Sequence, residues 1–450
     1  MSAKNNINVP FPKKPYKTHG GVHPHHNKTT SGVESVIMPP PEYVTISMNQ
    51  NIGADCIPCV KPGDTVYLGQ IIGDSDKYMS VPIHASVSGT VEKIIKQRDP
   101  AGRISDAVVI KSDGLMTPYL DLKAENPQNL SELTDTVRQS GLVGLGGAGF
   151  PAHIKLNVPE GKDVDTLIIN FAECEPYITA DHREALENSW DVFSGIYAFK
   201  DIIGIKRVII AIENNKPDAI EVLKRIADNP TYDPDDLVRI LVLKASYPYG
   251  AEKVLIKACT NRVVPEGGLP SDVGCLVMNI TSVSFISRYI KSGMPLVSKR
   301  VTVDGSAVKE PKNIIAPIGT SVKDIIEFCG GYKSEPKKLI LGGPMMGVAI
   351  ADDSECIKKN TNAILAFDEA ESSLMRETAC IRCGRCAQSC PMLLTPPLIE
   401  QQLKLNNLDE LKKLDVMNCM ECGCCAYSCP AGKHLVQMMR NAKAKLRNVK

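Results

Sequence analysis

The stretches 380-CIRCGRCAQSCP-391 and 419-CMECGCCAYSCP-430 repeat one cysteine pattern near the C-terminus. Both read C-x2-C-x2-C-x3-C-P, a spacing that holds [4Fe–4S] clusters in pairs. In such a pair, three close cysteines bind one cluster and the fourth reaches the other cluster. The sequence therefore predicts a two-cluster lobe with crossed ligand sets: Cys380, Cys383, Cys386 and Cys429 for one centre, and Cys419, Cys422, Cys425 and Cys390 for the other.

Zinc ligation and disulfide bonding are the alternatives for these cysteines. Zinc sites usually pair two C-x-x-C units and lack a third cysteine in step with them. Two complete sets of four thiolates favour iron–sulfur clusters, and therefore a protein that transfers single electrons.

Length and composition restrict the class of protein. The chain has 450 residues, enough for about three domains of ordinary size. Its net charge of +1 and 43% apolar content indicate a globular protein and argue against a nucleic-acid binder. Half of the 16 cysteines are not assigned to clusters, and free thiols beside iron–sulfur ligands indicate a reducing compartment, the cytoplasm. The N-terminus lacks the apolar segment of a signal peptide, and no run of 18 apolar residues would span a membrane.

The first part of the chain predicts an arm and a small β domain. Residues 1–38 are polar and rich in Pro, Gly and His, and we expect an extended arm. Short alternating segments between turn signals follow in residues 39–115, among them Tyr43–Ser47, and they predict an all-β unit. The pieces KPGDTVYLGQIIG and HASVSGTVEKI resemble a barrel-sandwich hybrid of the biotinyl and lipoyl type. An unmodified structural barrel is favoured over a carrier modified at Lys77.

The rest of the chain predicts three further units. Residues 116–300 should form a Rossmann-like α/β domain, because four apolar runs read as buried parallel strands: Thr166–Asn170, Arg207–Ile212, Val238–Leu243 and Cys275–Ile280. A helix is expected at Pro217–Asn229, with proline in its first turn. Residues 301–350 indicate a β-grasp module, 351–372 a polar linker and 373–450 the helical, ferredoxin-type two-cluster domain. The fold class is multidomain α/β.

The glycine-rich stretch 141-GLVGLGGAGFP-151 indicates a second cofactor. Gly144, Gly146 and Gly149 fit G-x-G-x-x-G, but a helix-like segment precedes them where a Rossmann site has a strand. Five glycines in nine residues nevertheless bring backbone N–H groups close to a ligand, commonly a phosphate. Lys155 would add a positive charge. The alternative is a tight turn before a helix, which needs fewer glycines.

Polar residues also follow a predicted strand in LIINFAECEPYITADHR. Asn170, Glu173 and Glu175 stand where open α/β sheets place ligands. The two acids could hydrogen-bond a ribityl hydroxyl and a nicotinamide amide. A solvated loop with surface carboxylates is the alternative.

The stretches GLVGLGGAGFP, NFAECEP and YPYGAEK resemble the NADH- and FMN-binding flavoprotein subunit of respiratory complex I. The resemblance implies a cofactor site made of Gly144, Gly146, Gly147, Phe150, Lys155, Asn170, Glu173, Glu175, Tyr247, Gly250, Glu252 and Asn279. In that family the glycine loop and the lysine hold FMN, and the phenylalanine stacks on the nicotinamide nucleotide. The first acid, Glu173, would lie by the flavin, and Glu175 would contact the nicotinamide as the catalytic residue.

The sequence departs from that family at three places. Leu145 stands where the family has an arginine in the glycine loop, and Ala251 replaces the first acid of Y-x-x-G-E-E. The adenine-side K-P-P-F-P is here VVPEGGLP. The nicotinamide end of the site is therefore better preserved than the adenine end.

The order of arm, barrel, flavoprotein-like domain, β-grasp module and two-cluster domain resembles the RnfC family, whose members belong to the Rnf complexes. These complexes are membrane-bound, ion-translocating ferredoxin:NAD oxidoreductases. The resemblance implies FMN, NAD(H) and two [4Fe–4S] clusters, and a peripheral place on the cytoplasmic face of the membrane. The partners would be the other Rnf membrane and iron–sulfur subunits, with ferredoxin acting indirectly.

Two other functions stay open. A relay subunit with an empty flavin site is one alternative, because of Leu145 and Ala251. A cobalamin reductase is another, although its family orders these modules differently.

Some features remain outside these motifs. Cys56 and Cys59 form a C-x-x-C without a partner pair, so ordinary thiols are favoured over metal ligands. The stretch HPHH at residues 23–26 is expected to pack on another subunit. The basic segment Lys433–Lys450 has apolar residues at helical spacing, and predicts either a membrane-surface helix or a docking helix of the cluster domain.

Overall fold

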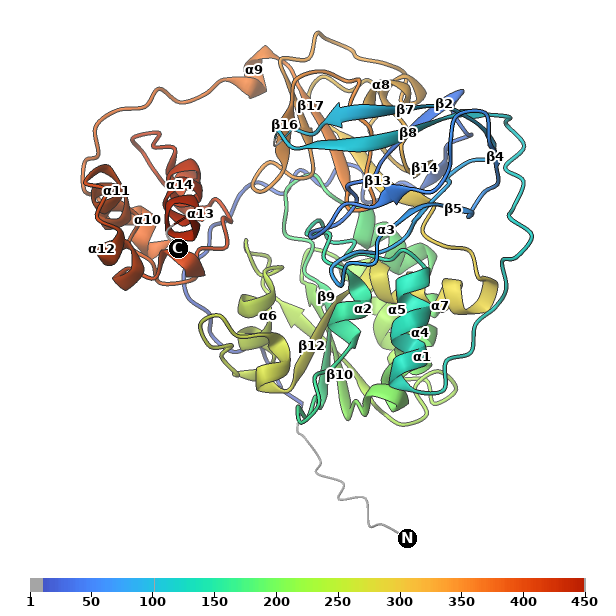
Figure 1. Ribbon diagram of the computed structural model, residues 1–450. Helices are drawn as coiled ribbons and strands as arrows, with labels where there is room; N and C mark the ends of the chain where they lie inside the picture. Colours follow the sequence, from blue (N-terminus) through green and yellow to red (C-terminus); the bar gives the residue numbers. More distant parts are fainter. Residues whose placement is uncertain (1–10, 101, 449–450) are drawn as a thin grey trace.

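The computed structural model describes residues 11–100 and 102–448, which form a barrel, an α/β unit, a mixed β unit and a C-terminal helical lobe (Figure 1). The helical lobe lies to one side of the α/β unit, and the blue N-terminal arm runs past it toward the mixed β unit. The architecture is multidomain α/β, as the sequence predicts.

The barrel consists of two antiparallel sheets that enclose one apolar core. Side chains from both sheets are fully buried in it, among them Val44, Ile72 and Val108. The first sheet has the order β2 (Tyr43–Ser47), β8 (Ile104–Ser112), β7 (Gly89–Arg98) and β4 (Thr65–Val66), and the second has β3 (Ile57–Pro58), β5 (Ile71–Asp74) and β6 (Ile83–His84).

The α/β unit is built on a four-stranded parallel sheet. Its strands coincide with the four predicted runs, in the order β11 (Val238–Leu243), β10 (Arg207–Glu213), β9 (Thr166–Phe171) and β12 (Cys275–Asn279). All three neighbouring pairs are parallel, so the four strands end at the same edge. The sheet is packed with α1 (Leu130–Gln139), α2 (Ala152–Leu156), α3 (Ala180–Glu187), α4 (Ser189–Ile203), α5 (Pro217–Ala227), α6 (Glu252–Thr260) and α7 (Ile280–Ser292), and a short 3-10 turn covers Pro270–Val273.

The mixed β unit is larger than the predicted β-grasp module. Its sheet has the order β1 (Val36–Ile37), β14 (Lys312–Pro317), β13 (Ser298–Asp304), β17 (Ala363–Phe367), β15 (Lys338–Leu341) and β16 (Val348–Ile350), with α8 (Val322–Phe328) and α9 (Glu369–Ser372) beside it. The prediction of a linker at 351–372 is wrong for β17, which is buried along its whole length between β13 and β15. Within the predicted extended arm, Val36 and Ile37 form β1, which pairs with β14. β1 has only two residues, too few for a strand pattern, and the apolar run AILAF of β17 stands within an otherwise polar segment.

The helical lobe contains short helices around the two cysteine motifs. They are α10 (Arg385–Gln388), α11 (Pro396–Lys404), α12 (Leu408–Lys413), α13 (Cys424–Tyr427) and α14 (Leu435–Arg447), with a 3-10 turn at Val416–Asn418. The apolar face of α14 is buried in the lobe at Leu435, Met439 and Ala442. Lys443 on this helix pairs with Glu421 at 2.6 Å. The structure therefore favours the docking-helix interpretation of the basic C-terminal segment.

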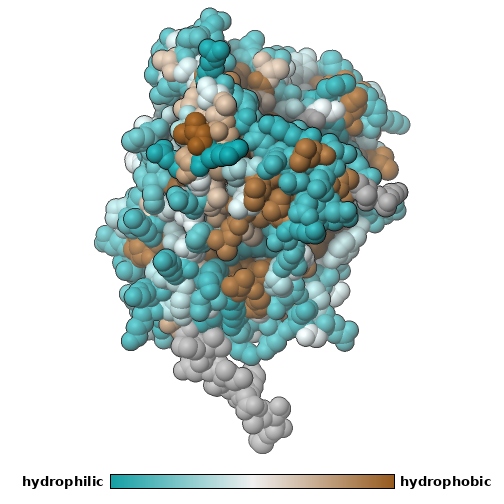
Figure 2. Space-filling model, turned by 90° about the vertical axis from the view of Figure 1, so that its left-hand side faces the viewer, coloured by the Kyte–Doolittle hydropathy of each residue, from teal (hydrophilic) through white to brown (hydrophobic). Residues whose placement is uncertain are grey.

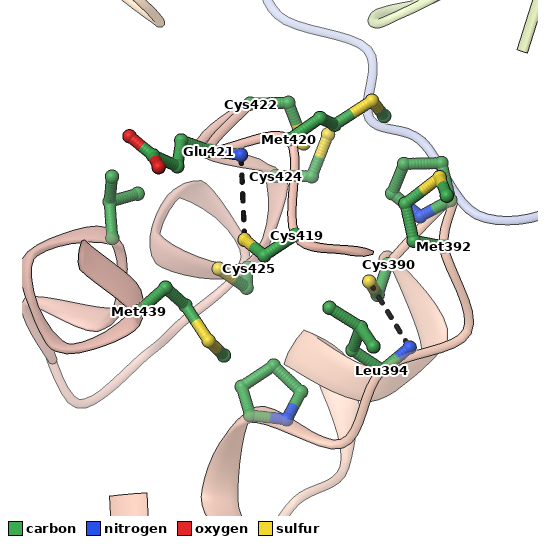
Figure 3. Close-up of a pocket in the computed structure, with 14 residues that line it drawn as sticks. Cys390, Met392, Leu394, Cys419, Met420, Glu421, Cys422, Cys424, Cys425 and Met439 are labelled. Atoms are coloured by element: carbon green, nitrogen blue, oxygen red, sulfur yellow. Dashed lines mark hydrogen bonds between the residues drawn. The ribbon is translucent and has the colours of Figure 1, made fainter. Parts of the chain in front are cut away.

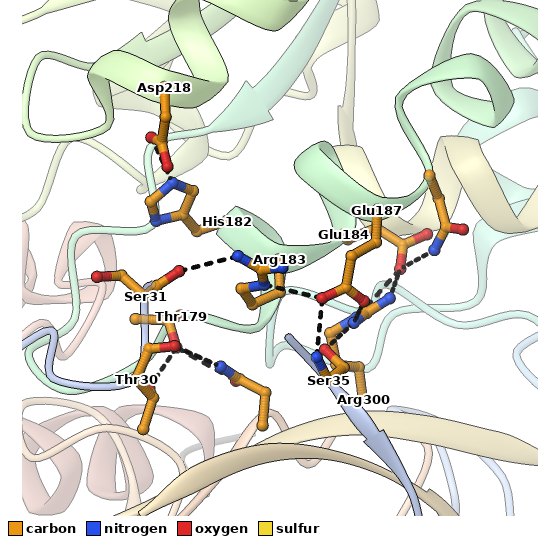
Figure 4. A network of polar contacts seen from close by, with 12 residues as sticks. Thr30, Ser31, Ser35, Thr179, His182, Arg183, Glu184, Glu187, Asp218 and Arg300 are labelled. Atoms are coloured by element: carbon orange, nitrogen blue, oxygen red, sulfur yellow. Dashed lines mark hydrogen bonds and ion pairs between the residues drawn. The ribbon is translucent and has the colours of Figure 1, made fainter. Parts of the chain in front are cut away.

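Buried ion pairs join α3 to the mixed β unit and to the arm (Figure 4). Glu184 binds Arg288 at 2.6 Å and Arg300 of β13 at 2.9 Å. Although burial alone would raise it, these two guanidinium groups lower the pKa of Glu184 to about 2, so the carboxylate stays ionised. The Ser35 N–H of the arm donates to Glu187 Oε1 at 2.9 Å in the same network.

Within the residues that the structure describes, no helix is long and apolar enough to cross a lipid bilayer.

Candidate functional site

The glycine-rich stretch forms a tight turn directly after α1, so no strand leads into it. The Gly144 N–H donates to Phe150 O at 2.8 Å and closes the turn. Gly147 has a φ of +112°, which favours glycine. In the described part of the chain, no acceptor binds the N–H groups of Gly146, Gly147 and Ala148. The turn therefore offers backbone donors to an anion such as a phosphate.

Asn279 ends β12 next to this turn. A Cβ at Gly146 would lie 3.2 Å from Asn279 Nδ2, so glycine lets the turn rest on this amide. Asn279 Nδ2 donates to Asp181 Oδ2 at 2.6 Å, and Asn279 Oδ1 accepts from the Ser282 N–H and caps α7. The turn thus lies at the carboxyl edge of the sheet, where open α/β sheets place ligands.

Lys155 lies on α2, just beyond the turn. Its Nζ pairs with Glu252 Oε2 at 2.5 Å and donates to Val277 O at 3.4 Å. Lys155 and Glu252, both predicted to contact the cofactor, therefore pair with each other. Their side chains are 30% and 34% exposed, so the ion pair is partly open to solvent.

Glu173, the first predicted acid, precedes α3 in the chain, and its buried carboxylate lies at the N-terminal end of that helix. Its carboxylate accepts hydrogen bonds from the Asp181 N–H at 2.7 Å and the His182 N–H at 3.3 Å. Burial raises the pKa of Glu173 to about 7. Glu173 caps α3 and is connected through Asp181 to Asn279 beside the glycine turn.

Glu175, the second predicted acid, reaches a loop of the mixed β unit. Its carboxylate accepts from the Met345 N–H at 3.0 Å and the Met346 N–H at 2.9 Å. A Cβ at Gly343 would lie 2.2 Å from Glu175 Oε2, so glycine leaves room for this contact. Burial raises the pKa of Glu175 to about 7. A carboxylate has acceptor sites beyond these two hydrogen bonds, so Glu175 can also serve a ligand.

Asn170 and Tyr247 connect the end of β9 with the segment before α6. Asn170 Nδ2 donates to Gly250 O at 2.8 Å. Tyr247 is 2% exposed, and its hydroxyl donates to Cys422 O in the second cysteine motif at 2.6 Å. The tyrosine predicted to line the flavin site therefore contacts a predicted cluster ligand.

A cavity in the helical lobe gathers one of the predicted ligand sets (Figure 3). Its lining includes Cys390 from the first motif and Cys419, Cys422 and Cys425 from the second. The crossed set thus surrounds one space. Four cysteine thiols are the donor set that a [4Fe–4S] cluster needs.

The other predicted set lies toward the surface of the lobe. Cys380 and Cys383 are exposed, whereas Cys386 is buried. Burial, with smaller contributions from the nearby Cys429 and Cys383, raises the pKa of Cys386, which indicates that Cys429 lies beside this set. The two sets therefore differ in position: Cys422 contacts the α/β unit, and Cys380 and Cys383 face solvent.

The helical lobe also exposes apolar side chains, and Ile381 among them stands between the exposed Cys380 and Cys383. Met375, Ile381 and Leu393 are all more than half exposed. The space-filling view from the side of this lobe shows apolar patches among polar side chains (Figure 2). Exposed apolar patches are typical of surfaces that meet another protein.

Two lysines outside the motifs hold the loops of this site. Lys28 of the arm donates to Glu173 O at 2.8 Å and Glu175 O at 2.9 Å. Lys359 donates to Gly141 O at 2.7 Å and to Pro82 O of the barrel at 2.6 Å. Burial lowers the pKa of Lys359 to about 7. No sequence signal marks these lysines, because every residue has a carbonyl that could accept their hydrogen bonds.

The remaining cysteines behave as ordinary side chains. Cys56 is buried in the barrel with its Sγ 3.2 Å from Val81 O, and Cys59 is exposed. Cys424 is fully buried, and its Sγ lies 3.9 Å from Tyr247 O, as expected of a packing residue beside a cluster. The expected contact of the histidine-rich stretch with another subunit stays a prediction.

Comparison with known protein families assigns most of the chain. Residues 16–115 match the RnfC barrel sandwich hybrid domain, and residues 137–288 match the Nuo51 FMN-binding domain. Residues 300–349 match the SLBB domain, and residues 374–430 match the 4Fe-4S dicluster domain. FMN and two [4Fe–4S] clusters are therefore the cofactors of these domains, and the residues described above fit them.

Curated relatives are similar over nearly the whole chain. The C subunit of the proton-translocating ferredoxin:NAD(+) oxidoreductase complex of Clostridium ljungdahlii is 42% identical over 84% of this chain and 83% of its own. The C subunit of the Na(+)-translocating ferredoxin:NAD(+) oxidoreductase complex of Acetobacterium woodii is 41% identical over 95% of this chain and 96% of its own. The C subunit of the ion-translocating oxidoreductase complex of Rhodobacter capsulatus is 40% identical over 97% of this chain and 84% of its own. With this identity and this coverage, the chain belongs to the RnfC family of the Rnf ion-translocating ferredoxin:NAD(+) oxidoreductase complexes.

Proposed function

We propose that this chain exchanges a hydride between NAD(H) and FMN and passes single electrons through two [4Fe–4S] clusters, as a subunit of an ion-translocating ferredoxin:NAD(+) oxidoreductase. FMN supplies the conversion between a two-electron hydride and single electrons. The chain supplies binding, orientation and electrostatics.

The contact between Tyr247 and Cys422 carries this proposal. It joins the predicted flavin site to the cavity lined by Cys390, Cys419, Cys422 and Cys425. A cluster in that cavity would be the one nearer the flavin. Electrons would then reach the second cluster, whose ligands Cys380 and Cys383 are exposed to solvent and to partners.

Different residues around the sheet edge would bind the phosphate, the flavin and the nicotinamide. The N–H groups of the glycine turn that bind no acceptor among the described residues, together with the ammonium group of Lys155, would hold the FMN phosphate. Asn279 and Glu173 are connected through Asp181 and would fix the flavin side of the site. Glu175 and Phe150 would orient the nicotinamide.

The proposed partners rest on the exposed cluster set and on the exposed apolar side chains of the helical lobe. We infer that this face exchanges electrons with iron–sulfur and membrane subunits of the same complex, and with ferredoxin only through them. The chain would therefore sit peripherally on the cytoplasmic face of the membrane. Its near-neutral net charge gives no support for a nucleic-acid partner.

The relay function with an empty flavin site is the second candidate. Leu145, where the related flavoproteins have an arginine, is 2% exposed and packs in the core of the α/β unit. It offers no cation to a phosphate. The N–H donors of the turn and Lys155 would take its place, which favours the enzyme.

Anaerobic reconstitution followed by rapid mixing with NADH separates the two functions. The enzyme should bind FMN and about eight irons with about eight acid-labile sulfides. NADH should bleach the flavin first and reduce the clusters afterwards. Dithionite is the control, because it reduces the clusters directly. A protein that binds no FMN, and whose clusters respond to dithionite but not to NADH, would establish the relay.

A further inference from the structure

The N-terminal arm lies between the helical lobe and the α/β unit at the place where their predicted cofactor sites meet. The Gly21 N–H donates to Ser389 O, next to the cluster ligand Cys390, at 2.9 Å. Val22 pairs with Tyr247 through two backbone hydrogen bonds of 2.8 Å and 3.0 Å. In Figure 3 the arm is the pale-blue ribbon that passes beside Cys390. One short segment therefore binds a cluster motif on one side and a flavin-site residue on the other.

Two consecutive glycines make this close approach possible. A Cβ at Gly20 would lie 2.7 Å from both Ser389 O and the Cys390 carbonyl carbon, and a Cβ at Gly21 would lie 2.8 Å from Tyr247 O. Their φ values, +63° and +91°, are in the left-handed region that favours glycine. Gly32, in the same arm, has no atom within 4 Å of its added Cβ. The steric requirement is thus confined to the contact with the cluster motif and Tyr247.

Lys28 continues the same contact into the acidic loop. Its ammonium group donates to the carbonyls of Glu173 and Glu175, at 2.8 Å and 2.9 Å, and also to Ile178 O. The Tyr177 N–H in turn donates to His26 O of the arm at 2.9 Å. The backbone that carries both predicted acids is therefore held by the arm and not by the parallel sheet alone.

We propose that residues 20–28 of the arm are a positioning strap for electron transfer: Gly20–Val22 set the place of the Cys390-containing cluster relative to the flavin site, and Lys28 sets the place of the acidic loop. The inference rests on the proposed function. The strap acts through other residues and contacts neither nicotinamide nor the reacting atoms.

The strap predicts that its two ends control different steps. In the full chain loaded with FMN and clusters, Gly20→Ala must displace the cluster motif from the arm. It should slow cluster reduction after mixing with NADH, while flavin bleaching keeps its wild-type rate. Lys28→Met should slow flavin bleaching by up to about 10²-fold, because misplaced reacting groups lose that much. Lys28→Arg should recover part of that rate, since it keeps the charge and the donors.

Stopped-flow absorbance measures flavin bleaching, and freeze-quench EPR measures cluster reduction. Gly32→Ala is the matched control and should follow the wild type in both. Wild-type cluster reduction in Gly20→Ala, or wild-type bleaching in Lys28→Met, would overturn the strap. If Gly20→Ala does not retain its clusters, the same two rates are measured in Gly21→Ala. The added methyl group of that variant meets Tyr247 O and not a cysteine motif.

Amide exchange separates failure of the strap from failure of the proposed function. If NADH does not bleach FMN in the wild-type protein, the proposed function is contradicted. The strap is then tested by amide exchange alone. Gly20→Ala should then accelerate exchange of the Gly21 and Val22 N–H groups by about two- to tenfold, as expected for loss of one net hydrogen bond. Unchanged exchange would overturn the strap in either case.

Discussion

Replacement of Glu175 by glutamine tests whether this carboxylate serves the nicotinamide as well as the loop at Met345. The wild-type carboxylate accepts two backbone hydrogen bonds, of 3.0 Å and 2.9 Å. Glutamine has one carbonyl oxygen, so it can keep one acceptor contact while its NH2 group faces the other N–H. Hydrogen bonds to a charged group contribute about 1.5–3 kcal/mol each, so opening of this loop should become about ten- to hundred-fold more frequent.

The same change should affect reaction with NADH without releasing FMN. If Glu175 also accepts a hydrogen bond from the nicotinamide amide, kcat/KM for flavin reduction should fall by roughly ten- to hundred-fold. The pKa of Glu175 is raised to about 7 by burial, so the carboxylate becomes ionised as the pH rises through that value. The wild-type rate should therefore increase with pH across about pH 7, and the Glu175→Gln rate should lack this step.

Two measurements decide the outcome. Hydrogen exchange at Met345 and Met346 reports the loop, and stopped-flow bleaching of FMN by NADH reports the hydride step. Cluster reduction by dithionite should be unchanged, and Glu221→Gln, an exposed acid on α5, is the matched control. Faster loop exchange with a wild-type bleaching rate at every pH would refute the nicotinamide role and leave Glu175 as a structural anchor.

Cys429→Ser should perturb the cluster bound by the first motif, and Cys390→Ser the cluster next to Tyr247, because each fourth cysteine serves the opposite set. EPR of the reduced protein distinguishes the two clusters, and damage confined to the cluster of the mutated motif would show that the ligation is not crossed. Lys155→Ala should weaken FMN binding by about one to two orders of magnitude, since a charge-assisted contact to phosphate contributes ~1.5–3 kcal/mol. Fluorescence titration of FMN measures this affinity, with the surface variant Lys162→Ala as control, and equal affinity in both would remove Lys155 from the phosphate site.

Local patterns predicted the elements whose physical requirements are local. The spacing of the cysteines reflects the size of a cluster, so spacing alone is enough to predict the ligand sets. The four parallel strands were found because strands buried on both faces are continuous apolar runs, such as 238-VRILVL-243. The glycine turn was recognised for the same reason, since its conformation depends on missing side chains. The strand β17 was missed because its apolar run, AILAF, lies within an otherwise polar segment.

The sequence by itself determined the cofactors, the strands of the α/β sheet and the family. The tertiary structure alone decided which site lies next to which. Tyr247 and Cys422 are 175 positions apart, and Lys28 and Glu173 are 145 apart, yet each pair is joined by a hydrogen bond. In both contacts the acceptor is a backbone carbonyl, which every residue has, so no residue type or spacing predicts the partner. The arm shows this most clearly: its composition indicates an extended segment, and only packing places it between a cluster motif and the flavin site.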